Sequence, residues 1–177
     1  MKQTKKIAIS SLCASLGVVF LYLGVIISVM DMTAALLASV LVLFCVIEMG
    51  YAYAFSVYAI ISVLSLLLLP NPSPAWMFIA AFGYIPIMKF GFEKIFKKFA
   101  WLPKLLLFNL LYALLIILGG ELLGFTVENT FGIPPYAMYI AFFVAGDLLY
   151  VICDILYARL VWFYMARLRE RIKKYLK

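Results

Sequence analysis

Six long apolar runs dominate this sequence and leave little choice about its environment. They cover residues 7–29, 33–49, 51–69, 75–90, 102–124 and 136–163. A helix needs about 20 apolar residues to cross a bilayer, with a range of about 17–25. Hydrophobic residues make up 68% of the chain, against about 45–50% in soluble domains. We therefore predict an all-α, polytopic membrane helix bundle with lipid as the solvent for much of its surface.

The second and third runs are almost continuous, since only Glu48 and Gly50 interrupt them. A single helix over residues 33–69 would be about 55 Å long at about 1.5 Å per residue, too long for a hydrocarbon core of about 30 Å. We therefore expect the helix to break near Glu48 and Gly50, which gives about six transmembrane helices.

The basic residues support this count, because Lys and Arg concentrate on the cytoplasmic side of membrane proteins. With six spans and a cytoplasmic N-terminus, the cytoplasmic stretches are 1–6, 48–51, 89–104 and the C-terminal end. All 15 basic residues belong to one of them: Lys2, Lys5, Lys6, Lys89, Lys94, Lys97, Lys98, Lys104, Arg159, Arg167, Arg169, Arg171, Lys173, Lys174 and Lys177. Residues 1–177 are thus predicted to form one transmembrane domain, with both termini inside, in a bacterial plasma membrane.

Two cytoplasmic segments are amphipathic or strongly basic. In the segment 90–101, apolar side chains recur at i, i+3, i+4 and i+7, at Phe92, Ile95, Phe96 and Phe99. Such a face can rest in the headgroup layer or bind a cytoplasmic partner. The sequence pattern is compatible with both interpretations. The basic C-terminal tail, 164–177, has the same two readings.

Several classes of chemistry are disfavoured. The chain has no histidine, which removes the commonest metal ligand and the Ser-His-Asp triad. It also has no P-loop, HExxH or GxSxG motif. The net charge of +7 sits at the ends of apolar runs and accompanies no groove-reading motif, so we expect lipid headgroups rather than nucleic acid as its partner. No catalytic residue, metal site or cofactor is predicted.

Polar residues inside the last span are the best candidates for a ligand site, because charges within spans usually face the bundle interior or a wet cavity. Asp147 and Asp154 are seven residues apart, and a tyrosine follows each of them by three, at Tyr150 and Tyr157. These four residues share one helix face. The face is typical of a ligand or ion site, and equally of interhelical hydrogen bonding, with Arg159 as a candidate counter-ion. Candidate partners on the fifth span are Asn109 and Tyr112.

Small residues crowd the first span, where the pairs Ser10/Ala14 and Ser11/Ser15 have small-xxx-small spacing. Such pairs let helices approach closely in lipid, either within the bundle or against another membrane subunit.

The opening stretch, Lys6-Ile7-Ala8-Ile9-Ser10-Ser11-Leu12-Cys13-Ala14-Ser15-Leu16-Gly17-Val18-Val19, resembles the first helix of the substrate-binding S components of energy-coupling factor (ECF) importers. Serine stands at three positions where that family has an alanine-rich surface. The stretch 83–89 is similar to an uncharacterised bacterial membrane family within the same broad group. The resemblance implies a small-molecule ligand, vitamin-like in class, and docking on a membrane coupling subunit with cytoplasmic ATPases.

Two other classes stay open. A non-catalytic scaffold similar to the small membrane subunit of the rod-shape (MreD) system would have five or six helices and a tightly packed interior. A membrane enzyme of isoprenoid or lipid metabolism would gather acidic residues near a headgroup plane. We favour the hypothesis of an importer subunit, which predicts an outward-facing polar cavity.

Overall fold

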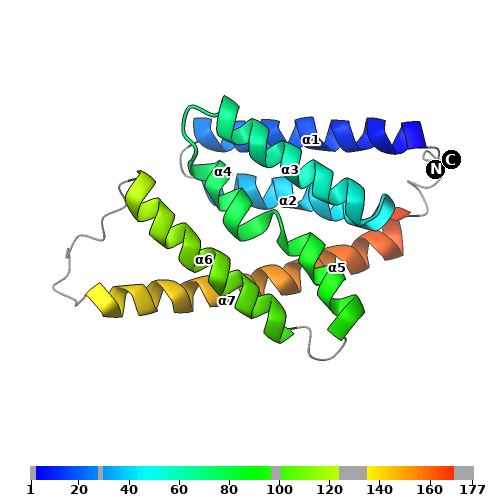
Figure 1. Cartoon of the computed structure of the whole chain (residues 1–177). Coiled ribbons are helices and arrows are strands. Elements are labelled where there is room, and N and C mark those ends of the chain that lie inside the picture. Colours follow the sequence, from blue (N-terminus) through cyan, green and yellow to red (C-terminus); the bar gives the residue numbers. More distant parts are fainter. Residues whose placement is uncertain (1–2, 28–29, 97–100, 124–134, 170–177) are drawn as a thin grey trace.

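The fold is a bundle of helices, seen in a computed structural model that describes residues 3–27, 30–96, 101–123 and 135–169 (Figure 1). The helical elements are α1 (Gln3–Ile26), α2 (Asp31–Glu48), α3 (Tyr51–Leu68), α4 (Ser73–Met77), η1 (Phe78–Phe82), α5 (Ile85–Phe96), α6 (Trp101–Leu123), α7 (Pro135–Phe163) and η3 (Tyr164–Leu168). Within these residues the structure contains no strand. The predicted all-α class is confirmed.

Five stretches are long and apolar enough to cross a membrane: Gln3–Ile26, Asp31–Glu48, Tyr51–Leu68, Ser73–Glu93 and Phe143–Arg167. A sixth, shorter apolar helix covers Trp101–Leu114 of α6. The chain is therefore a multi-pass membrane protein. Residues 97–100 of the expected amphipathic segment 90–101, residues 124–134 between the last two expected spans, and residues 170–177 of the expected tail lie outside the described residues.

The break between the second and third spans lies where the length argument put it. Helix α2 ends at Glu48 and α3 begins at Tyr51. The backbone amides of Met49 and Gly50 both donate to the carbonyl of Cys45, at 3.0 and 3.1 Å. Gly50 has a φ of 95°, a conformation that glycine adopts without the steric cost of a Cβ atom. This residue allows the chain to reverse direction.

The fourth span is interrupted rather than straight. Its helix passes from α4 into the π-helical turn η1, bends at residues 83–84 and continues as α5. A Cβ on Gly83 would lie 2.8 Å from ring atoms of Tyr58, so glycine permits this close approach to α3. We expected a separate amphipathic segment from residue 90, but residues 90–96 continue α5, so the span and the first part of that segment form one helix.

The first three helices pack closely at small residues. A Cβ on Gly17 would come within 2.5 Å of Ile61, and one on Gly24 within 2.7 Å of Ala34. The centre of this group is fully buried and includes Leu21, Ala35, Ala38, Val42, Val57 and Ile61. Close backbone approach of this kind stabilises helix pairs in lipid through van der Waals contact.

Successive spans alternate in direction. In Figure 1 the start of α1, the α2–α3 turn and the end of η3 lie toward the right, and the junctions α1–α2 and α3–α4 lie toward the left. The basic N-terminal and C-terminal ends of the described helices are thus on one side, as a cytoplasmic location of both would require. The inside orientation itself stays a prediction.

Candidate functional site

A polar pair joins α6 and α7 in the middle of α7. The side-chain amide of Asn109 donates to Oδ1 of Asp147 at 3.0 Å, and it also donates to the carbonyl of Leu105 on its own helix at 3.2 Å. Both side chains are half-buried. The structure therefore brings together two of the candidate residues from different spans.

Aromatic residues lie within about one helical turn of this pair on both α6 and α7. Phe108 is buried between Tyr112, at 5.6 Å between ring centroids, and Tyr150, at 4.7 Å. Tyr112 also meets Phe143 edge-on at 5.6 Å. A Cβ on Gly146 would approach the Tyr112 ring to 2.9 Å, so this glycine lets the ring lie against α7. The polar carboxylate–amide pair and these aromatic rings thus belong to the same contact between α6 and α7.

Asp154 belongs to a different environment, an ion-pair cluster nearer the predicted cytoplasmic end of α7. The ammonium of Lys89 on α5 lies 2.8 Å from Oδ1 of Asp154 and also donates to the Asp154 carbonyl at 2.7 Å. Lys89 is 5% exposed and the Asp154 side chain 33%, so the ammonium is buried while the carboxylate is partly open to the surroundings. An ammonium held by two oxygens of one residue is a firm link between α5 and α7.

Two more charges complete this cluster, which we define as Lys89, Glu93, Lys104 and Asp154. Lys104 on α6 lies 2.7 Å from Oε1 of Glu93 and 3.7 Å from Asp154, while Lys89 lies 3.8 Å from Glu93. Two cations and two anions balance. The cluster joins α5, α6 and α7, and its internal pairing is typical of a structural element rather than an empty ligand site.

The polar stripe of α7 thus faces inward, but it does not form one site. Tyr150 and Tyr157 are buried, and Tyr157 forms a hydrogen bond with Ser39 on α2. Asp147, Asp154 and Tyr157 each have a partner on a different helix. Arg159, the candidate counter-ion, is exposed, and the carboxylate of Asp154 is paired with Lys89 instead.

Sequence reasoning missed the roles of Lys89, Glu93 and Lys104, since the two lysines were interpreted only as charges at the membrane surface. The spacing of Lys89 and Glu93 at i and i+4 was the available signal, because such residues share a helix face.

The small residues of α1 divide between two faces. Ser10 and Ala14 are buried, and the Ser10 hydroxyl donates to the sulfur of Met49 at 3.2 Å. Ser11 and Ser15 are exposed, and their hydroxyls donate to the carbonyls of Ala8 and Leu12 on their own helix, at 2.9 and 3.0 Å. Only the second pair lies on a surface open to another membrane subunit.

Comparison with family models, curated proteins and solved structures found no match. The described residues also contain no group of three or more His, Cys, Asp or Glu side chains placed to hold a metal ion. The polar pair of Asn109 and Asp147 is therefore the best candidate for a functional site within the described residues.

Proposed function

We propose that this protein is the substrate-binding membrane subunit of a small-molecule importer in a bacterial plasma membrane, energised by a separate ATPase module. The observation that carries the proposal is the environment of Asp147. A charged residue at the centre of a span costs about 2.5–3.5 kcal/mol on insertion scales, and Asp147 lies within the apolar helix α7. Within the described part of the chain, Asp147 has a neutral partner, Asn109, and no cationic one. Asp154, by contrast, has Lys89.

This contrast supports a ligand-binding role for Asp147. A carboxylate without a cation, on the same helix pair as the ring cluster of Phe108, Tyr112 and Tyr150, suits a ligand with a cationic or hydrogen-bond-donating group and an apolar body. The aromatic faces attract the cation and pack the apolar part, and Asn109 orients the carboxylate.

The exposed pair Ser11/Ser15 supports the second half of the proposal, contact with a membrane coupling subunit. Small side chains on an exposed helix face allow close approach of a partner helix. The chain contains no P-loop, so ATP hydrolysis by that route would belong to the partner.

A scaffold role is the second candidate, and the ion-pair cluster favours it. Lys89 on α5 is paired with Asp154 on α7, and Tyr157 on α7 is paired with Ser39 on α2. These contacts hold α2, α5 and α7 together. A rigid bundle whose acidic side chains are paired with residues of other helices needs no ligand.

Native mass spectrometry of the gently purified full chain separates the two functions. An importer subunit retains a small-molecule adduct and a co-purifying ATPase module. A protein that carries only lipid adducts and no ATPase, after purification from cells grown in rich medium, contradicts the importer proposal and favours the scaffold.

A further inference from the structure

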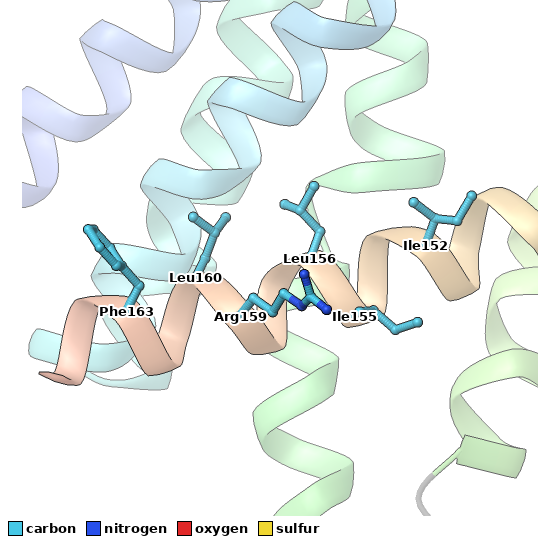
Figure 2. A pocket seen from close by; sticks show the side chains of 6 residues that line it. All are labelled: Ile152, Ile155, Leu156, Arg159, Leu160 and Phe163. Atoms are coloured by element: carbon cyan, nitrogen blue, oxygen red, sulfur yellow. The ribbon is translucent and has the colours of Figure 1, made fainter.

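The outward face of α7 presents an arginine where lipid is expected. Arg159 is exposed, between Ile155 and Leu160, which belong to the apolar part of the same helix (Figure 2). Within the described residues it has no carboxylate partner. An unpaired guanidinium on a lipid-facing surface is costly unless an anion compensates it.

A groove lies alongside this arginine. Its volume is about 380 Å³, and it opens onto the surface of the bundle. It is lined by Ile152, Ile155, Leu156, Arg159, Leu160 and Phe163. Figure 2 shows that Arg159 is the one polar side chain among the six. An apolar groove of this size, with one charged group, matches a ligand that has a hydrocarbon chain and an anionic head.

Arg159 lies in the half of α7 nearer the predicted cytoplasmic end, from which a long side chain can reach the headgroup region. Asp154 lies 3.7 Å from Lys104, which is near the start of α6 at Trp101. Arg159 follows Asp154 by five residues, about 7 Å further toward the predicted cytoplasmic end at about 1.5 Å per residue. Trp162, on the same face of α7, is 73% exposed, and indoles favour the membrane interface.

We propose that α7 holds a binding site for one anionic phospholipid of the cytoplasmic leaflet. The guanidinium of Arg159 binds the lipid phosphate, and an acyl chain lies along Ile152, Ile155 and Leu156 toward the bilayer centre. Arginine is suited to this because its planar fork donates two parallel hydrogen bonds to a phosphate. An anionic headgroup is favoured over a zwitterionic one, since it brings no ammonium to oppose Arg159, and the cytoplasmic leaflet is negatively charged.

The test uses the full chain in nanodiscs of equal phosphatidylglycerol and phosphatidylcholine, with the retained lipid identified by native mass spectrometry. We expect the wild type to retain one phosphatidylglycerol with a preference of about fivefold or more, the ratio that one cation near a membrane surface provides. Arg159→Gln should remove the preference, and Arg159→Lys should keep part of it. Arg167→Gln is the matched control, since Arg167 is exposed on η3 outside the groove, and it should behave as the wild type.

A second variant tests the groove without changing the charge. Ile155→Trp fills the apolar part and should lower phosphatidylglycerol retention while Arg159 remains. A wild type without lipid preference overturns the proposal and favours an acidic partner protein at Arg159. Equal losses of phosphatidylglycerol preference in Arg159→Gln and Arg167→Gln also overturn it, because general attraction between basic residues and anionic lipid would then explain the preference.

Discussion

The amide of Asn109 on α6 donates to the carboxylate of Asp147 on α7 at 3.0 Å, whereas the other acid of the same helix face, Asp154, is bound by the ammonium of Lys89 at 2.8 Å. One acid therefore has a neutral partner and the other a cationic one. On this difference we propose opposite roles for the two acids, ligand contact for Asp147 and structural pairing for Asp154, and these roles predict which variants should lose stability.

Lys89→Met should destabilise the protein by about 2 kcal/mol, below the range of about 3–5 kcal/mol for a fully buried pair, since Asp154 is partly exposed and Lys104 remains 3.7 Å from it. Thermal unfolding in detergent measures the change. Arg167→Met is the control on an exposed basic residue and should change stability by less than about 0.5 kcal/mol. The double variant Lys89→Met/Asp154→Leu should recover part of the loss. Independent, additive losses would contradict the pairing.

Gly146→Ala should destabilise the contact between α6 and α7. The added Cβ would lie 2.9 Å from the Tyr112 ring, and overpacking of this kind costs about 1–3 kcal/mol. Gly91→Ala is the matched control in α5, where a Cβ meets nothing within 4 Å, and it should stabilise by about 0.5–1 kcal/mol through helix propensity. If both substitutions raise the melting temperature, Tyr112 does not lie against Gly146.

The inward face of α7 was predictable, because residues seven apart in a helix share a face and four polar groups recurred on it. The need for an α2–α3 break followed from the length of the apolar run, and its position followed from Glu48 and Gly50, which interrupt that run. The pairing of Asp154 with Lys89 was not predictable, since a lysine at the end of a span has the same sequence pattern whether it reaches lipid headgroups or a carboxylate on a neighbouring helix. That choice depends on how α5 and α7 are placed in three dimensions. The π-helical turn η1 had no recognised signal, and its geometry depends on contacts such as the hydrogen bond from Tyr58 to the carbonyl of Ile79.

Two leucine substitutions on α1 should act differently. Ser11→Leu enlarges an exposed side chain and should prevent co-purification of a coupling subunit while leaving the melting temperature unchanged. Ala14→Leu places a larger side chain at a buried position and should lower the melting temperature instead. Normal co-purification of every partner with Ser11→Leu would rule out docking on this face.

The inside orientation of the termini is open to a labelling test. Cys13, Cys45 and Cys153 are buried, so the native thiols should contribute little background. A cysteine at Ser73, beside the α3–α4 junction, should react with an impermeant maleimide in whole cells. A cysteine at the exposed Arg167 should react only after the cells are opened. The reversed pattern would invert the proposed topology.

Ligand occupancy in matched variants of Asp147 and Asp154 is the decisive measurement for the proposed ligand-binding role of Asp147. Asp147→Asn removes the charge but keeps an oxygen that accepts from Asn109, so it should cost less than about 1 kcal/mol of stability. Native mass spectrometry should show a small-molecule adduct on the wild type, its loss in Asp147→Asn at an almost unchanged melting temperature, and its retention in folded Asp154→Asn at a lowered one. An adduct that survives in Asp147→Asn, or a large fall in the melting temperature of that variant, would contradict the assignment of Asp147 as a ligand-binding residue.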